Sequence, residues 1–140
     1  MASMTGPEIE GFLAAPRHAV LATNGPSGAP QLTPVWFLYD GGQLWVSAGA
    51  NTAKVRNLRR DPHITLCIDG GHPDARYVVI TGRARLVEPN EPLQQEIRWR
   101  IIRHYHNSEE DARAYYEEVR GTPAVLIVIE PETVLSQNLN

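Results

Sequence analysis

The chain has 140 residues and a mass of 15.6 kDa, the size of one domain, which we predict over residues 1–140. Hydrophobic residues make up 42% of it and charged residues 21%, so it can fill a core and is too apolar to be disordered. Its 13 Lys and Arg against 16 Asp and Glu give a formal net charge of -3, which argues against a nucleic-acid-binding surface. The single cysteine, Cys67, allows no internal disulfide and excludes a four-cysteine zinc site. Because no long apolar run and no signal-like segment follows Met1, we expect a cytoplasmic protein that does not engage a membrane.

Local signals in the first half of the chain predict one helix and three strands. Thr5 and Glu8 have the spacing of a capping box, which predicts an amphipathic helix over residues 5–15, ended by Pro16. Apolar runs bounded by turns rich in Gly, Pro and Asn are typical of strands. Strands are therefore expected over residues 18–23, 31–39 and 43–48, and the last two flank the hairpin turn Asp40-Gly41-Gly42.

Three helical patterns lie in the second half. Asn51 or Thr52 can cap a helix over the segment AKVRNLRR, and Asp61-Pro62 ends it. Ser108 and Asp111 have capping-box spacing and open a helix that runs to about residue 119. Between them, apolar residues recur every four positions and mark one face of another helix: Leu93, Ile97, Ile101 and Tyr105.

Further strands are expected over His63–Asp69, Arg76–Val87 and residues 124–130, the last followed by 133–135. Six strands at short spacing with few helices favour a mainly β protein with helices (α+β), built on an antiparallel β-barrel, over a parallel doubly wound sheet. No GxGxxG pattern follows a strand, so a Rossmann dinucleotide site has no support.

A basic segment is the most informative stretch for function. It holds four of the 13 basic residues within seven positions: Lys54, Arg56, Arg59 and Arg60. The small-residue loop 47–52 precedes it and can present backbone N–H groups at a helix N-terminus. Open amides, the positive end of the helix dipole and basic side chains together suit a phosphate group. A solvated helix face explains the same residues equally well.

A second candidate feature is the segment QLTPVWF, residues 31–37. Pro34 cannot donate to a sheet ladder and therefore marks an edge or an interrupted pairing, which frees neighbouring backbone groups to bind a planar heterocycle. The alternative is an edge strand whose Trp36 only packs. A tryptophan near arginines, here Trp99 and Arg103, is typical of an interface or of the rim of a ligand site. The alternative is that Trp99 only packs against its own chain.

Hydrolytic and metal-dependent chemistry find little support in the sequence. The five histidines, at positions 18, 63, 72, 104 and 106, have no metal-ligand spacing and are interpreted as surface or packing residues. Cys67 lies in an apolar run and is expected to be an inert core thiol. No GxSxG nucleophile motif is present, and helix caps or solvent-exposed faces explain the paired carboxylates, so nothing indicates a hydrolase.

Four segments together resemble the pyridoxamine 5'-phosphate oxidase-like split β-barrel superfamily. They are HAVLAT, GAPQLTPVWFLYDGG, KVRNLRRDPHITLCID and RYVVITGRARLV, and the resemblance covers almost the whole chain after the first helix. The most specific is KxRNLRRDP, which is similar to the branch of small reductases that use the deazaflavin coenzyme F420. The resemblance implies a six-stranded split barrel that forms a homodimer with two equivalent cofactor sites at the interface.

The resemblance also implies the residues of the site. It puts the cofactor phosphate on Lys54, Arg56 and Asn57, with Ser47 and the loop residues Ala50, Asn51 and Thr52 near the phosphate or the ribityl chain. The strand along the ring supplies mainly backbone contacts, from Gln31, Thr33, Pro34, Val35 and Trp36. Trp99 and Arg103 are expected to approach from the partner subunit. No catalytic side chain and no metal ligand is assigned.

By the same resemblance the protein is expected to be an oxidoreductase in which the cofactor carries a hydride to a small conjugated organic substrate. The basic cluster favours F420, which has a phosphodiester and an acidic tail, and FMN is the alternative. The sequence is also compatible with a pyridoxamine 5'-phosphate oxidase-like enzyme, with a non-catalytic flavin, deazaflavin or haem carrier, and with a structural dimer without cofactor. The substrate phosphate-binding residues of the true oxidase have no clear counterpart here.

Overall fold

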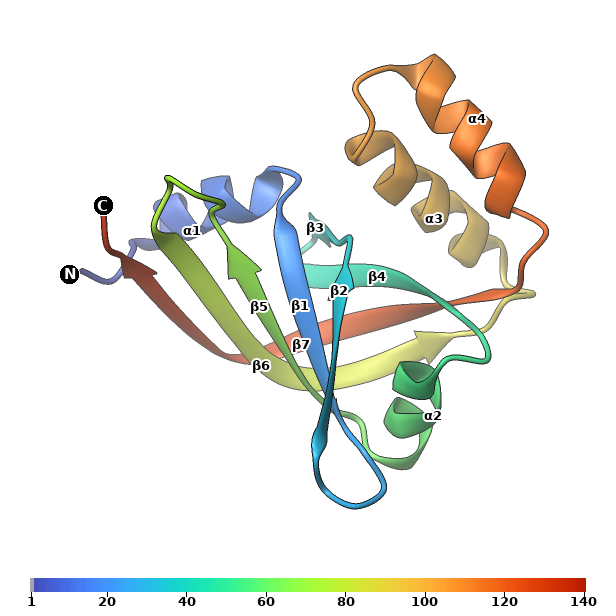
Figure 1. Cartoon of the computed structure of the whole chain (residues 1–140), viewed down its shortest axis with the longest axis horizontal. Coiled ribbons are helices and arrows are strands. Elements are labelled where there is room, and N and C mark those ends of the chain that lie inside the picture. The colour runs from blue at the N-terminus through green and yellow to red at the C-terminus, as the bar shows by residue number, and fades with distance from the viewer. Residues whose placement is uncertain (1) are drawn as a thin grey trace.

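The computed structural model describes residues 2–140 and shows seven strands and four helices over them (Figure 1). The helices are α1 (Gly6–Ala14), α2 (Ala53–Arg60), α3 (Pro92–His104) and α4 (Glu109–Val119). The strands are β1 (His18–Asn24), β2 (Pro30–Val35), β3 (Leu38–Asp40), β4 (Gln43–Gly49), β5 (His63–Asp69), β6 (Arg76–Val87) and β7 (Ala124–Asn138).

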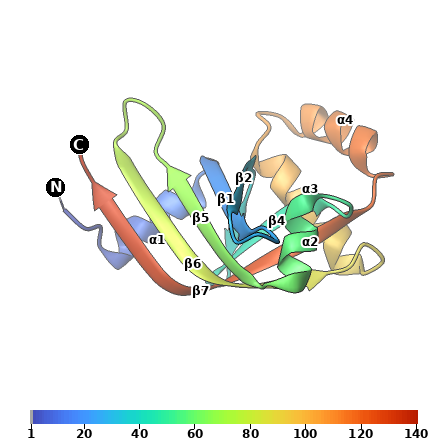
Figure 2. The ribbon, with the colours of Figure 1, turned by 60° about the horizontal axis from the view of Figure 1, so that its bottom comes forward.

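The strands form one curled sheet in the order β2-β1-β5-β6-β7-β4-β3, and every neighbouring pair is antiparallel (Figure 2). The expected antiparallel sheet combined with helices is therefore confirmed. The two edge strands, β2 and β3, follow each other in the chain, so the sheet curls back toward itself as an open half-barrel. The α3–α4 hairpin stands at the β4 end of the sheet, and α1 lies near the two chain ends (Figure 1).

The count of six strands was wrong, because the segment expected as one strand over residues 31–39 is two. β2 ends at Val35 and pairs with β1, whereas β3 begins at Leu38 and pairs with β4 on the opposite edge. Between them the Phe37 N–H donates to the hydroxyl of Tyr105 at 3.2 Å, outside any strand ladder. The chain therefore crosses from one edge of the sheet to the other at Trp36 and Phe37.

The predicted side-chain caps are present at the starts of two helices, α1 and α4, and absent at the start of α2. Thr5 and Glu8 form a reciprocal capping box, with N···O distances of 2.9 and 3.3 Å, and the Asp111 N–H donates to Ser108 Oγ at 3.1 Å. Thr52 occupies the N-cap position of α2, but its hydroxyl donates to the Gly49 carbonyl at 2.8 Å and so does not cap the helix. The Thr52 hydroxyl thus stabilises the turn before α2 and not the first turn of the helix.

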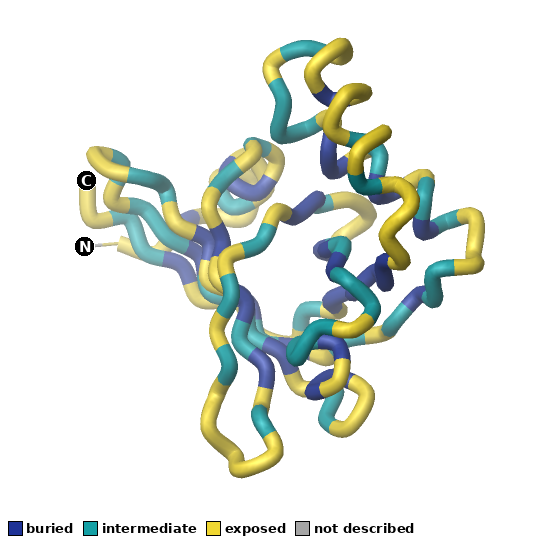
Figure 3. Tube along the Cα trace, turned by 45° about the vertical axis from the view of Figure 1, so that its right-hand side comes forward, coloured by how far each residue is buried: buried dark blue, intermediate teal, exposed yellow. Residues whose placement is uncertain are grey.

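The hydrophobic core fills the inside of the curl, and α3 packs on a second cluster beyond it. Buried residues alternate with less buried ones along β1, β4 and β5, because successive side chains point to opposite faces (Figure 3). The first half of β7 is buried on both faces: Ile127 belongs to the inner core and Val128 to the cluster with Ile97 and Ile101 of α3. At the bulge between β6 and β7 only glycine fits, since a Cβ at Gly82 would overlap the Glu130 carbonyl.

The prediction of a buried Cys67 was wrong. In β5 the side chains of Ile64, Leu66 and Ile68 point inward, and the two-residue period therefore places Cys67 on the outer face, where it is exposed. Strand register sets it beside Val20 of β1 and Val79 of β6. Leu135 of β7 pairs in turn with Val79 and is 54% exposed, so an apolar row crosses the outer face of four strands.

Candidate functional site

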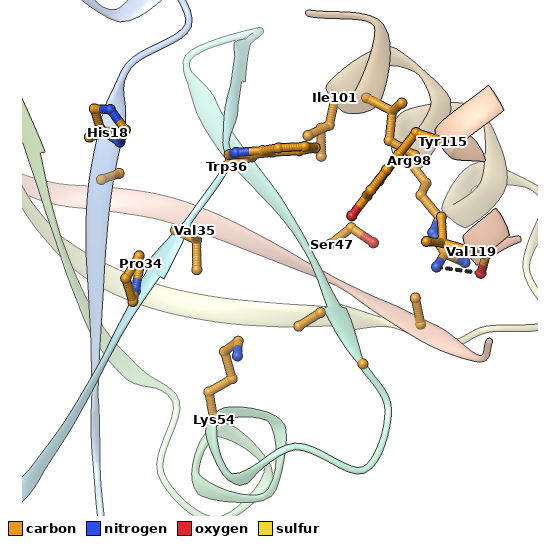
Figure 4. A pocket seen from close by; sticks show the side chains of 15 residues that line it. His18, Pro34, Val35, Trp36, Ser47, Lys54, Arg98, Ile101, Tyr115 and Val119 are labelled. Carbon is orange, nitrogen blue, oxygen red and sulfur yellow. Dashed lines mark hydrogen bonds between the residues drawn. The ribbon is translucent and has the colours of Figure 1, made fainter. Parts of the chain in front are cut away.

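A cavity of about 380 Å³ lies between the sheet, α2 and the α3–α4 hairpin (Figure 4). Fifteen residues line it: His18, Ala19, Pro34, Val35, Trp36, Ser47, Ala48, Gly49, Lys54, Arg98, Ile101, Ile102, Tyr115, Val119 and Ala124. The structure thus brings together five of the predicted site residues, from β2, the β2–β3 junction, β4 and α2. None of these fifteen described residues is acidic, so the cavity is a basic and aromatic site.

Lys54 provides a cation at one end of this cavity. It lies in the first turn of α2, and Figure 4 shows its side chain pointing from the helix into the cavity. Within residues 2–140 it forms no ion pair, and burial alone lowers the pKa of its ammonium. A half-buried cation without a counter-charge is costly, and an anionic ligand would remove that cost.

Arg98 is a second cation on the cavity wall, and its guanidinium holds the helical hairpin together. It is 7% exposed and donates to the Val119 carbonyl at 2.8 Å (Figure 4) and to the Thr122 carbonyl at 3.0 Å. These carbonyls lie at and just after the end of α4, where a cation complements the helix dipole. Burial lowers the pKa of Arg98, and no carboxylate pairs with it among the described residues.

Aromatic side chains from the hairpin enclose Trp36. Its indole stacks on Tyr105, with ring centroids 5.0 Å apart and planes 9° apart, and lies 5.6 Å from the ring of Tyr115. Trp36 follows directly on β2, which within residues 2–140 pairs with β1 alone, so the expectation that Pro34 marks a sheet edge is confirmed. The backbone of this edge and an aromatic wall therefore face the same cavity.

The loop before α2 lies outside the lining of the cavity. The Ala50 N–H donates to the Pro123 carbonyl at 3.1 Å, and the Thr52 N–H to the Gly49 carbonyl at 3.2 Å. Asn51 accepts at its carbonyl from the guanidinium of Arg56 at 2.7 Å. The amides of Ala50 and Thr52 thus have partners within the chain. Arg56 is exposed and follows Lys54 by two positions, which places it on another face of the helix.

Three further predicted residues also lie outside the lining. Asn57 is 5% exposed, and its side-chain amide donates to Thr23 Oγ1 at 3.1 Å, which joins α2 to β1. Gln31 accepts a longer hydrogen bond from the same hydroxyl at 3.4 Å. The Thr33 hydroxyl is buried and has no hydrogen-bond partner within residues 2–140. Asn57 thus joins α2 to β1, and its contact with a cofactor phosphate stays a prediction.

Trp99 and Arg103 lie on the hairpin, and neither lines the cavity. Trp99 packs edge-to-face on Tyr116 with centroids 5.6 Å apart, and the guanidinium of Arg113 lies 5.0 Å from the centre of its ring. Arg103 donates to the His106 carbonyl at 3.0 Å. Their approach to the site of a partner subunit stays a prediction.

Sequence reasoning missed the part of the cavity that the hairpin supplies. Arg98 and Tyr115 are the two polar members of that part, and they reach the cavity only because α3 and α4 dock against the sheet. One available signal was that Arg98 falls on the same helix face as Ile97, Ile101 and Ile102. A charged residue on an apolar face must find polar partners, which marks it for attention.

Two further properties of the described residues concern membranes and metals. No helix within residues 2–140 combines the length and apolar character that crossing a membrane requires. Over the same residues, no three His, Cys, Asp or Glu side chains come together in a way that could hold a metal ion.

The half-barrel fold has counterparts among known proteins. The family model described as pyridoxamine 5'-phosphate oxidase matches residues 5–138, nearly the full length of the chain. The chain therefore belongs to the pyridoxamine 5'-phosphate oxidase family, as the resemblance predicted.

Solved structures show the same fold. Conserved hypothetical protein Rv2991 from Mycobacterium tuberculosis is 28% identical, with a TM-score of 0.76 over 96% of this chain and 85% of that one. An F420 reductase is 23% identical, with a TM-score of 0.69 over 89% of this chain and 94% of that one. General Stress Protein 26 from Bacillus anthracis is 18% identical, with a TM-score of 0.64 over 91% and 89%. At these identities the last two show the fold alone.

Proposed function

We propose that this protein is an oxidoreductase that binds coenzyme F420, or alternatively FMN, in the cavity around Lys54 and with it reduces a small conjugated organic molecule. The observation that carries the proposal is the half-buried ammonium of Lys54, which faces a cavity without a carboxylate. A cofactor phosphate supplies the missing negative charge. Family membership and the fold shared with an F420 reductase support the same class of cofactor.

The other walls of the cavity fit a planar ring attached to such a phosphate. Pro34 and Val35 offer the backbone of a sheet edge along which the ring can lie, and the backbone of Trp36 continues that edge. Ser47 adds a hydroxyl on the β4 side. When bound, the reduced cofactor supplies a hydride that adds, with a proton from solvent, across a conjugated double bond and leaves the cofactor oxidised. The task of the chain is to bind and orient the two molecules and to exclude water.

The cations of α2 favour F420 over FMN. Arg59 is occupied by Glu88, with two N···O distances of 2.9 Å. Arg56 and Arg60, in contrast, bond only to neutral groups, the former to the Asn51 carbonyl and the latter to Asn24 and Asn57. Together with Lys54, three cations of this helix are left without an acidic partner among the described residues. That exceeds what one phosphate monoester needs and suits the acidic tail of F420.

We also propose a homodimer, in which a second copy covers the apolar row on the outer face of the sheet. Val20 and Leu135 are 40% and 54% exposed there, and Cys67 lies between them in the row. Apolar residues that form one continuous patch, unlike isolated exposed ones, are typical of an interface. This arrangement would bring a partner subunit onto the outer face of β1, β5, β6 and β7.

The absorbance spectrum of the purified protein, followed by titration with F420 and with FMN, tests the proposal. We expect bound chromophore or saturable binding, with tighter binding of F420, and cofactor-dependent reduction of cyclohexenone. Tight binding without turnover of any acceptor would favour a carrier. Failure to bind either cofactor would remove the assignment.

A further inference from the structure

The α3–α4 hairpin contributes a hydroxyl group that its own contacts leave unused. Tyr115 lies in α4, is 37% exposed, and lines the cavity opposite Lys54. Within residues 2–140 its hydroxyl makes no hydrogen bond, whereas the hydroxyl of Tyr116 donates to Gln95 at 3.0 Å. In Figure 4 the Tyr115 phenol points from α4 into the cavity, toward the strand that carries Ser47.

Packing fixes the direction of this phenol. Its ring lies 5.6 Å from the ring of Trp36 and 5.3 Å from that of His106, which is itself bonded to the Ile102 carbonyl at 2.7 Å. Arg98 ties the end of α4 to α3 through two carbonyls, so the C-terminus of α4 is fixed as well as the ring of Tyr115. A hydroxyl held in this way can orient a ligand with little loss of conformational entropy on binding.

The neighbourhood of the hydroxyl defines what it can bind. Trp36 is 39% exposed and offers a flat aromatic face beside it, and Ile101 and Ile102 make the adjoining wall apolar. A ligand there is therefore planar and mostly apolar, with an oxygen at one edge to accept a hydrogen bond. Lys54 lies on α2, across the cavity from the hairpin. With the cofactor phosphate at Lys54, the hairpin side of the cavity is left for the substrate.

We propose that Tyr115 is the residue that orients the substrate: its hydroxyl donates a hydrogen bond to a carbonyl oxygen of the acceptor, whose ring lies against Trp36. This inference rests on the proposed function and deepens it, because it assigns the specificity for a planar carbonyl compound to the helical hairpin rather than to the sheet.

A pair of small probes isolates the contribution of the hydroxyl. Acetophenone and ethylbenzene have similar size, but only the first has a carbonyl oxygen. Their dissociation constants are measured by ligand-observed NMR with the F420-loaded protein and with the protein without added cofactor. Tyr115→Phe removes the hydroxyl alone, and Tyr116→Phe is the matched control, since that hydroxyl lies outside the cavity lining.

We expect Tyr115→Phe to weaken acetophenone binding roughly threefold to tenfold, the value of one neutral hydrogen bond. It should leave ethylbenzene and F420 binding unchanged, and Tyr116→Phe should change none of the three. Unchanged acetophenone binding, or an equal loss for both probes, overturns the inference. A loss of F420 affinity in Tyr115→Phe also overturns it, because the hydroxyl would then contact the cofactor. If the wild type binds no cofactor, the proposed function fails, while the probe comparison without cofactor still decides the role of Tyr115.

Discussion

The hydroxyl of Tyr105 and the backbone N–H of Phe37 lie 3.2 Å apart, and this contact joins the end of α3 to the point where the chain leaves one sheet edge for the other. The same hydroxyl accepts from the Arg17 N–H at 3.3 Å and donates to the Arg17 carbonyl at 2.9 Å. One phenol thus satisfies three backbone groups that no strand ladder reaches. Burial raises its pKa, although its two N–H partners act in the opposite direction.

Replacing this residue should therefore destabilise the fold. Tyr105→Phe keeps the ring that stacks on Trp36 but leaves the three part-buried backbone groups without their partner. We expect the free energy of unfolding to fall by about 1–3 kcal/mol, measured by urea denaturation. Tyr39→Phe is the control, because its hydroxyl bonds to the exposed carboxylate of Glu10. Equal effects of the two substitutions would contradict this account.

Lys54→Ala should weaken cofactor binding tenfold to a hundredfold, since it removes a charge-assisted contact worth on the order of 1.5–3 kcal/mol. Stability without cofactor should not fall, because the half-buried ammonium has no acidic partner within the described chain. Arg59→Ala serves as the control, because Arg59 pairs with Glu88 outside the cavity. Fluorescence titration of both variants with F420 and FMN measures the effect. Affinities equal to those of the wild type would remove Lys54 from the site.

The carboxylate of Asp61 predicts a pH dependence at the end of α2. Hydrogen bonds from the Asn24 side chain, and then from the backbone and ring of His63, lower its pKa from 3.8 to about 2. Because the folded-state pKa is the lower one, this stabilisation is present above pH 3.8 and is lost as the pH falls through about 2. The difference in Tm between the wild type and Asp61→Ala should therefore shrink over that window. A difference that stays constant with pH would show that the charge of Asp61 is not involved.

The labelling rate of the Cys67 thiol can test the proposed dimer. The thiol is exposed in one chain, and burial together with Asp69 raises its pKa, so its reaction with a thiol reagent should be slow at neutral pH and faster above it. In a dimer that covers the apolar row, labelling should slow further as the protein concentration rises. Light scattering in parallel gives the oligomeric state. Labelling that is independent of concentration while the protein is dimeric would place the interface elsewhere. Cys67→Ala should retain reductase activity.

Local sequence patterns predicted most of the helices and strands. Capping at Thr5 and Ser108 and the alternation along β1 and β5 act over a few residues and can be read from the sequence. The break at Trp36 could not, because it depends on the hydroxyl of Tyr105, which is 68 residues away from Phe37. The error at Cys67 has a different cause: an apolar run was taken as uniformly buried, although its two-residue period already placed the thiol outside.

The residues of the candidate site also fall into a predicted group and a group that the sequence did not reveal. Pro34, Ser47 and Lys54 lie in or close to the segments that carry the family resemblance, and the structure brings them to one cavity. Arg98 and Tyr115 belong to the hairpin, where the resemblance is least distinct, and their position depends on how α3 and α4 dock on the sheet. Packing of helices against a sheet is decided by surfaces far apart in sequence, so the residue types alone did not reveal this wall.

The position of β7 has a consequence for how the molecule assembles. In the sheet order β2-β1-β5-β6-β7-β4-β3, this strand is the single link between a four-stranded part and the β3–β4 hairpin within the described residues. It also follows all the other strands in the sequence, so the two parts stay unjoined during synthesis until its 15 residues have left the ribosome. Pairings of such long sequence separation form slowly. The nascent protein therefore presents two unpaired strand edges, on β6 and β4, during the interval when aggregation and chaperone binding compete with folding.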